Sequence, residues 1–376
     1  MKLLSRPLEV VLVGDNPTRL WGIGVDERVA RIAAAHKLAI GEQPVGDGAA
    51  LLVDRSFVFD PAWLREIAAH PGTALTQGGR IALAHCRNEQ ERRDAAAAMA
   101  AAAAPSAATT LNLRRHEQGG TQLNAELRKR EQPFLMILEP ASVRTAERAS
   151  YFGAYKGVTD LLTKYLWPEW ALVLTRLAAR LGITPNTVTA IGALLCVVTT
   201  ILFWRGDYWI GMATALGFMV LDTVDGKLAR CTITSSKCGN IFDHGIDLIH
   251  PPFWWYAWGV GLAAYGRPLD ARTFALVIAV IVLGYVVQRV IEGAFMRLYG
   301  MHIHVWRKVD SDFRLITARR NPNMVILLVS LVLGRPDLGL IAVAIWTIVS
   351  CLFHLVRLVQ AVRVRAGGGE IRSWLG

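Results

Sequence analysis

Four aspartates lie close together in the second half of this 376-residue chain. Asp222 and Asp225 are three residues apart, so they share one face of a helix. Asp243 and Asp247 are four apart and share a face in the same way. Two such helices packed together would direct four carboxylates at one point, where their charges repel. Hard divalent cations relieve that repulsion, and oxygen ligands of this kind suit Mg²⁺ or Mn²⁺. The spacing therefore predicts a metal site.

Small residues and one arginine accompany the aspartates at helical spacing. Gly226, Ala229 and Arg230 continue the face of the first pair, and Gly239 lies four residues before the third aspartate. Small side chains let a ligand or a neighbouring helix approach the backbone closely. A lone aspartate here would be interpreted as a helix cap or an ion-pair partner. Four acids among apolar runs favour a functional site, because charge inside a membrane is costly.

The elements that must position these residues are apolar runs. The chain is 53% hydrophobic and 19% charged, and the charges are frequent only up to about Arg180. From Thr187 onward the apolar runs approach the ~20 residues that a helix needs to cross a bilayer. We predict an α-helical polytopic membrane domain of six transmembrane helices, preceded by a soluble α/β domain. The six spans are Val188–Trp204, Tyr208–Ala229, Asp243–Ala264, Phe274–Phe295, Met324–Leu333 and Leu338–Ala361.

The net charge of +11 is concentrated beside the apolar runs. Its excess on one side predicts that the aspartates and both termini face the cytoplasm, in a multi-pass protein of the cell (inner) membrane. The same distribution argues against nucleic-acid binding and favours contact with membrane lipids. The five cysteines are scattered and predict reduced thiols. The pattern leaves open whether the protein forms a homodimer.

Residues 1–140 alternate short apolar strands with helices, which indicates a cytoplasmic α/β domain with a largely parallel sheet. Residues 141–186 are expected to form a linker and an interfacial helix, and residues 187–376 the membrane domain. The predicted strands are Leu8–Gly14, Ala50–Val53, Arg80–His85 and Phe134–Leu138, and the predicted helices are Asp26–Ile40, Pro61–His70 and Asn88–Ala104.

The pattern D-x2-D-G-x2-A-R-x8-G-x3-D-x3-D is complete from Asp222 to Asp247 and resembles the signature of the CDP-alcohol phosphotransferases. The resemblance covers roughly Thr184–Ala361. It implies transfer of a substituted phosphate from a CDP-linked donor to an alcohol acceptor, with release of CMP, in phospholipid or related lipid biosynthesis. It also implies that Asp247 completes a site for two metal ions and deprotonates the acceptor hydroxyl. The other implied metal ligands are Asp222, Asp225 and Asp243, and the implied CDP-binding residues are Gly226, Ala229, Arg230 and Gly239.

Three further residues are candidate contacts to an acceptor or a phosphate. His244 flanks the motif and would serve as a ligand or a base, or pack in the core. Arg307 and Lys308 follow the fourth span and would bind phosphate or simply orient the loop. A metal-ion transporter is the alternative from another class, but the chain shows no internal repeat of the kind that transporters carry.

The first strand is followed by Gly14–Leu20, which looks like the phosphate loop of sugar-phosphate nucleotidyltransferases, with Asp54 at the place of their metal-binding aspartate. Pro17 departs from that pattern by removing a backbone N–H, and the usual Pro-Lys-Pro is absent. We expect an inactive domain, with a bifunctional cytidylyltransferase/phosphotransferase as the alternative.

The run from Thr232 to Gly245 resembles that of the choline and ethanolamine phosphotransferases. It favours a CDP-linked polar headgroup as donor and a lipid alcohol as acceptor. The alternative is CDP-diacylglycerol with a small polyol or polyol phosphate.

Overall fold

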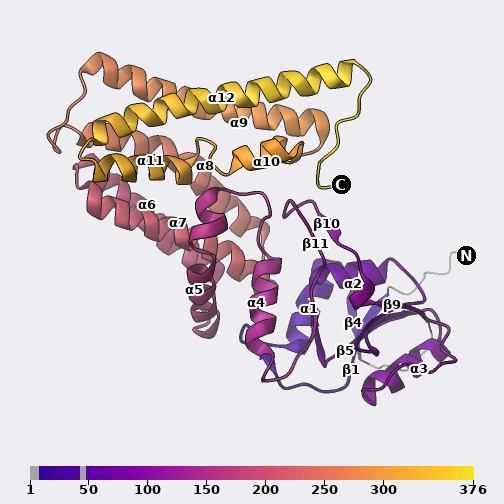
Figure 1. Ribbon diagram of the computed structural model, residues 1–376. Helices are drawn as coiled ribbons and strands as arrows, with labels where there is room; N and C mark the ends of the chain where they lie inside the picture. Colours follow the sequence, from indigo (N-terminus) through magenta and orange to yellow (C-terminus); the bar gives the residue numbers. More distant parts are fainter. Residues whose placement is uncertain (1–7, 43–47) are drawn as a thin grey trace, which may run out of the picture.

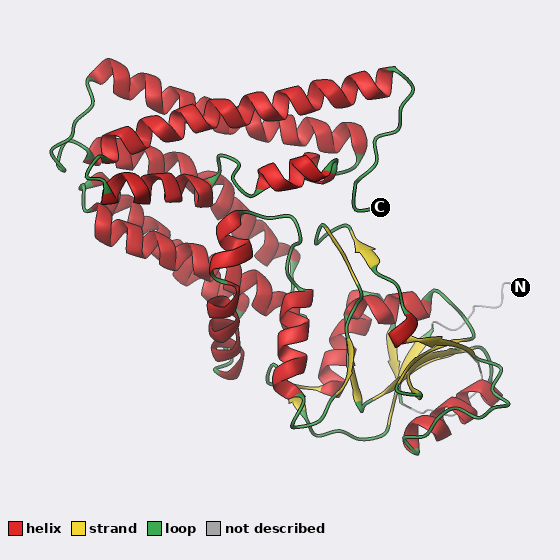
Figure 2. Ribbon diagram, in the orientation of Figure 1, coloured by secondary structure: helices red, strands yellow, loops and turns green. Residues whose placement is uncertain are grey.

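The computed structural model describes residues 8–42 and 48–376, and within helix α8 it leaves the side chains of Cys238, Asn240, Asp243 and His244 undescribed. It has a helical part and a smaller α/β part, joined through helices α4 and α5 (Figure 1). The strands are confined to the α/β part (Figure 2).

The α/β part is built on a six-stranded sheet with the order β4-β1-β5-β8-β7-β9. These strands are β1 (Glu9–Val13), β4 (Ala39–Gly41), β5 (Ala50–Asp54), β7 (Thr73–Gln77), β8 (Arg80–Cys86) and β9 (Asn112–Arg115). The shorter strands are β2 (Arg19–Leu20), β3 (Ile23–Gly24), β6 (Phe57–Phe59), β10 (Gln122–Asn124), β11 (Lys129–Glu131) and β12 (Leu135–Ile137). The helices are α1 (Val25–Ala35), α2 (Pro61–Ala68) and α3 (Glu89–Ala100).

The prediction of a largely parallel sheet is confirmed for three of the five pairings among the described strands, since β7 also pairs in parallel with β9, and it fails only at β8. β1 pairs in parallel with β4 and β5, whereas β8 runs antiparallel to both of its neighbours, β5 and β7. The reason is the hairpin that joins β7 to β8 through Gly78 and Gly79, both with positive φ. The helix predicted to reach Ile40 ends at Ala35, because Lys37 turns with φ 59° and β4 follows. The predicted strand at 134–138 forms β12, which pairs with β6 outside the main sheet.

The helical part has one helix at each of the six predicted spans. These are α6 (Pro185–Trp204), α7 (Tyr208–Cys231), α8 (Lys237–Gly261), α9 (Ala271–Tyr299), α11 (Arg320–Val332) and α12 (Pro336–Ala366). The other helical elements are α4 (Val143–Gly153), η2 (Leu162–Leu166), α5 (Pro168–Arg180), η3 (Ile303–Val305) and α10 (Lys308–Arg314).

Three helices of the described chain, α6, α9 and α12, are long and apolar enough to cross a membrane. On α9, Leu276, Leu283 and Val290 recur every seven residues and are 64%, 64% and 63% exposed. Such a stripe of large exposed apolar side chains fits lipid better than water. The helical part is therefore a membrane domain. Helices α7 and α8 carry the charged motif, and α11 has only 13 residues.

The membrane domain contains a very close helix contact at Gly261, where a Cβ would overlap the carbonyl oxygen of Phe203. We expect Gly261→Ala to destabilise the domain by about 3 kcal/mol, because backbone atoms cannot move aside as a side chain can. Thermal unfolding of the purified protein in detergent measures the effect. Gly293→Ala is the matched control, since a Cβ there meets nothing within 4 Å. Equal melting temperatures for both variants would contradict the expectation.

The α/β part, which is the predicted soluble domain, forms hydrogen bonds to the carboxyl-terminal end of α7. Arg28 of α1 donates to the carbonyl oxygen of Cys231 at 2.8 Å, and Arg31 donates to that of Thr232 at 2.6 Å. The last carbonyls of a helix have no partners within the helix, and the helix dipole favours positive charge there. Helix α1 thus caps the helix that carries Asp222 and Asp225.

Candidate active site

The described signature residues line a cavity of about 680 Å³ between the membrane domain and the soluble domain. Asp222, Asp225 and Asp247 all contribute to its wall. So do the four residues predicted to bind CDP, which are Gly226, Ala229, Arg230 and Gly239. These seven residues of the predicted motif are therefore brought to one place by α7 and α8.

Asp222 and Asp247 converge on one guanidinium. Arg320, at the start of α11, donates through Nη2 to Asp222 Oδ2 and through Nη1 to Asp247 Oδ1, at 2.6 Å each. The two carboxylates thus approach each other closely enough to share one planar cation. An oxygen pair in this arrangement fits a hard divalent cation as well. The sequence offered no signal for Arg320, which lies about 100 residues from Asp222 and belongs to no local pattern.

Asp225 is buried, and its Oδ2 accepts a hydrogen bond from Thr189 of α6 at 2.6 Å. Helix α6 also supplies Asn186, whose side-chain oxygen would lie 2.9 Å from a Cβ added at Gly239. A larger residue than glycine would therefore displace Asn186 from the cavity wall. Three helices, α6, α7 and α8, meet at this point.

The other predicted site residues either have side chains that the structure does not describe or lie outside the cavity. The side chains of Asp243 and His244 lie outside the described residues. Arg307 and Lys308 do not belong to the described cavity wall. Arg307 stacks on Trp306, and Lys308 binds Asp312 at 3.0 Å on the exposed face of α10. The same segment instead places Arg314 and Arg319 on the wall.

A buried polar network closes the cavity beside α11. Asn321 donates to Asp160 Oδ1 at 3.0 Å, and Thr163 donates to Oδ2 at 2.8 Å. Burial opposes the charge of Asp160, but the Arg314 guanidinium and these hydrogen bonds outweigh it and hold the pKa of Asp160 below its usual value. The carboxylate stays ionised, which keeps the start of α11 in register with the segment before α5.

Residues 182–311 match the sequence model of the family described as CDP-alcohol phosphatidyltransferase. Over this segment the chain is similar to that family. Cholinephosphotransferase 1 of Gallus gallus is 34% identical over 127 residues, which cover 31% of this chain and 36% of the relative. The human protein of the same name is 34% identical over 138 residues, covering 34% and 32%. An uncharacterized family member of Schizosaccharomyces pombe is 35% identical over 107 residues, covering 25% and 28%.

The matched part of the chain thus spans about a third of the length of these relatives. A solved structure of the Mycobacterium tuberculosis phosphatidylinositol phosphate synthase with CDP-DAG bound was also found. It is 18% identical with a TM-score of 0.40, and the alignment covers 50% of this chain and 92% of that one.

The phosphate-loop-like segment of the soluble domain has its polar groups occupied by internal bonds. Asn16 donates to the carbonyl oxygens of Arg55 and Leu138, at 2.9 Å each. Arg55 forms a two-point pair with Asp26 at 2.6 and 2.9 Å and donates to the Gly14 carbonyl at 2.7 Å. Arg55 holds the pKa of Asp26 below its usual value through this bond.

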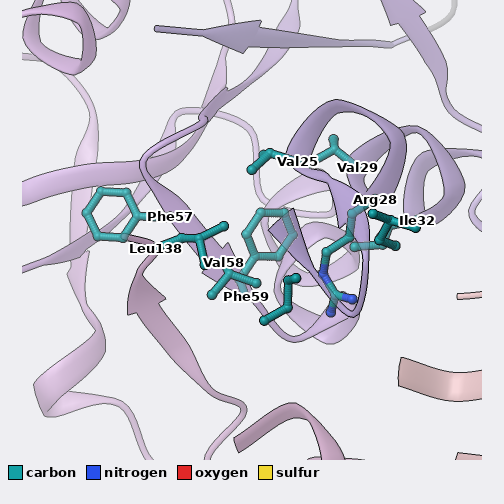
Figure 3. A pocket seen from close by; sticks show the side chains of 10 residues that line it. Val25, Arg28, Val29, Ile32, Phe57, Val58, Phe59 and Leu138 are labelled. Atoms are coloured by element: carbon teal, nitrogen blue, oxygen red, sulfur yellow. The ribbon is translucent and has the colours of Figure 1, made fainter. Parts of the chain in front are cut away.

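The predicted counterpart of a metal-binding residue, Asp54, is 1% exposed and accepts from the Ser56 backbone N–H at 2.8 Å and from Arg80 at 3.3 Å. A pocket beside α1, lined by Val25, Val29 and Phe59 with Arg28 among them (Figure 3), has a volume of only about 10 Å³. That is about the space of one water molecule.

Proposed function

We propose that this chain is a membrane enzyme that transfers a substituted phosphate from a CDP-linked donor to an alcohol and releases CMP. The convergence of Asp222, Asp225 and Asp247 on one cavity is the observation that supports it most, because this motif also carries the family resemblance. The test is CMP release by the purified chain in detergent, supplied with Mg²⁺, a CDP-donor and an alcohol. Absence of release with every pair of substrates would overturn the proposal.

The residues divide the chemistry between them. Asp222, Asp225 and Asp243 would hold two divalent ions, Mg²⁺ or Mn²⁺, together with Asp247. Bound there, such ions supply positive charge to the diphosphate and to the departing CMP. Asp247 takes the proton of the acceptor hydroxyl as the new O–P bond forms and the bond to CMP breaks. Gly226, Ala229, Arg230 and Gly239 line the wall that receives the cytidine nucleotide.

One substrate is expected to be a lipid. Leu248, Pro251 and Tyr285 line the cavity, and the Tyr285 hydroxyl donates to the Leu248 carbonyl at 2.9 Å. Next to them on α8, Ile249 and Phe253 are 63% and 60% exposed. The wall between α8 and α9 is therefore apolar on its outer side, where an acyl chain would lie while the polar half reaches the carboxylates.

We assign the lipid to the acceptor, because the similar segment of the cholinephosphotransferases and the run from Thr232 to Gly245 agree. A water-soluble CDP-headgroup with diacylglycerol or ceramide is then expected to give a new phospholipid, detected by mass spectrometry. CMP release only from CDP-diacylglycerol, with a soluble polyol or polyol phosphate as acceptor, would reverse this assignment and leave the reaction class standing.

The soluble domain is proposed to be inactive in nucleotidyl transfer. Arg55 is already bound to Asp26 and to the Gly14 carbonyl, and the Asn16 amide to the Arg55 carbonyl, so these side-chain donors beside the loop are not free for a phosphate. We expect the full chain to release no pyrophosphate from CTP with any sugar- or polyol-phosphate. Robust pyrophosphate release would instead support the bifunctional alternative, and a coupled pyrophosphate assay distinguishes the two.

We further propose that the site faces the cytoplasm of the cell membrane. Arg130 of the soluble domain donates to the Leu375 carbonyl at 3.1 Å, so the soluble domain and the end of α12 lie on one side of the membrane domain (Figure 1). This agrees with six crossings and with the excess of Lys and Arg on that side.

A further inference from the structure

The cavity has a second end, where guanidinium groups outnumber carboxylates. Glu292 of α9 accepts from Arg319 at 2.6 and 2.5 Å and from Arg289 at 3.2 Å. Two more arginines, Arg128 and Arg314, line the same cavity. Within the described part of the chain, neither has a hydrogen bond or ion pair from its guanidinium. Nε of Arg128 and both Nε and Nη1 of Arg314 are buried without a partner.

Guanidinium groups whose N–H donors have no acceptor are costly to bury. Burial, together with the neighbouring Arg319 charge, lowers the pKa of Arg128 to about 10. Burial likewise lowers the pKa of Arg314 well below its usual value, and Arg319 adds to the effect. A guanidinium keeps its proton in proteins at neutral pH, so both groups are cations. Asp160 offsets part of the Arg314 charge, but the unsatisfied N–H groups of both arginines remain costly to bury, and an anion that accepts hydrogen bonds from them removes that cost.

A metal ion is a poor occupant of this end. Glu292, His304 and His354 bring their ligand atoms within 4.8 Å of one another, as a metal site would. However, Arg319 already binds both oxygens of Glu292, and its Nη2 lies 3.4 Å from His304 Nε2. A cation would meet that fixed charge at close range. The surroundings select an anion.

Arg128 reaches this end from the soluble domain. It lies in the turn between β10 and β11, a hairpin that extends toward α10 (Figure 1). The turn is held from both sides, because the Gly157 N–H donates to the Leu127 carbonyl at 2.8 Å and Lys129 Nζ donates to the Gly153 carbonyl at 2.7 Å. A Cβ at Gly157 would come within 2.7 Å of the Arg128 carbonyl oxygen. The hairpin tip is thus packed in place rather than loosely exposed.

We propose that Arg128, supplied by the soluble domain, completes with Arg314 and Arg319 an anion subsite of the transferase cavity that holds a phosphate group of a substrate. This inference rests on the proposed function for the identity of the substrate. The phosphate comes either from the diphosphate of the CDP-linked donor or from a phosphorylated acceptor. In both cases the soluble domain is part of the transferase site even if it catalyses nothing itself.

The test uses the full chain in detergent with Mg²⁺ and calorimetric titration of inorganic phosphate, CMP and CDP. Arg128 has φ 51°, a region that asparagine tolerates, so Arg128→Asn replaces the charge with little backbone strain. We expect it to weaken phosphate binding about tenfold or more, since a charge-assisted hydrogen bond is lost. Arg128→Lys should recover much of that binding. Arg130→Asn, on the exposed side of the same hairpin, is the matched control and should bind as the wild type does.

The probes separate the two sources of phosphate. If Arg128→Asn has a lower affinity for CDP and an unchanged affinity for CMP, the subsite binds the donor. If the variant has a lower affinity for inorganic phosphate and unchanged affinities for CDP and CMP, the subsite binds the acceptor. Unchanged affinity for phosphate and CDP in Arg128→Asn overturns the proposal.

A measurement on the wild-type chain does not depend on any variant folding. Phosphate should slow phenylglyoxal modification of Arg128, mapped by mass spectrometry, and leave Arg130 unaffected; absence of protection also overturns the subsite. Failure of the wild type to release CMP would refute only the proposed reaction.

Discussion

Replacing Asp222, Asp225 or Asp243 by asparagine is expected to lower metal-dependent CMP release by about 10³-fold, since each change removes charge from the point where the diphosphate is neutralised. Asparagine has nearly the same size as aspartate, and in Asp225→Asn the amide oxygen can still accept the hydrogen bond from Thr189. The variants should therefore remain folded. Asp247→Asn should cost about 10²- to 10⁴-fold, as expected for a lost general base, while donor binding persists.

Rates are measured with saturating Mg²⁺, and chelation by EDTA should reduce the wild type to the level of the variants. Asp207→Asn is the matched control, because Asp207 lies at the opposite end of α7, where its side chain pairs with Arg205 at 3.2 Å and makes no capping hydrogen bond. Near-normal turnover in any of Asp222→Asn, Asp225→Asn or Asp243→Asn would refute the shared metal site.

Removal of Arg320 is expected to tighten metal binding. A cation that binds Asp222 and Asp247 competes with the guanidinium that already donates to both at 2.6 Å. Arg320→Gln eliminates that positive charge, and we expect the apparent Mn²⁺ affinity to rise about tenfold or more, as Coulomb energies at this range allow. Turnover should nevertheless fall, because the two carboxylates lose the group that holds them together.

Arg320→Lys separates charge from geometry. Lysine keeps the charge but is a single point rather than a planar fork, so it cannot reproduce the two-point contact. Its Mn²⁺ affinity, followed by electron paramagnetic resonance, should stay near that of the wild type. If Arg320→Gln bound Mn²⁺ more weakly than the wild type, the guanidinium would be a support for the metal site and not its competitor.

The aspartate site could be predicted from the sequence because the spacing of its residues is local. A helix fixes the relation of Asp222 to Asp225 without knowledge of any other segment, so the motif alone predicted a common face. Thr189, Arg320 and Arg128 are brought to the same cavity by α6, α11 and a hairpin of another domain. No periodicity links such distant positions, so only the folded chain reveals them.

In the soluble domain, too, features with a local sequence signal could be predicted and features that depend on distant segments could not. The strands at β1, β5 and β8 follow from their apolar runs, and in the structure α2 and α3 begin after the side-chain caps Asp60 and Asn88. The direction of β8 did have a local signal. Gly78 and Gly79 form a two-residue turn with positive φ, which is typical of an antiparallel hairpin, and it indicated that β7 and β8 pair as neighbours. Short edge strands such as β4 and β9 offered too few residues for an alternating pattern.

The two bonds from α1 to the end of α7 also imply an order of assembly. Domains generally fold as units during synthesis, the amino-terminal one first. Arg28 is only 4% exposed in the finished molecule, yet its acceptor, the Cys231 carbonyl, is made about 200 residues later. The folded soluble domain must therefore keep that guanidinium in water until α7 has been made and has packed against it. A nascent chain that misplaces α7 is left with an exposed arginine between its two domains.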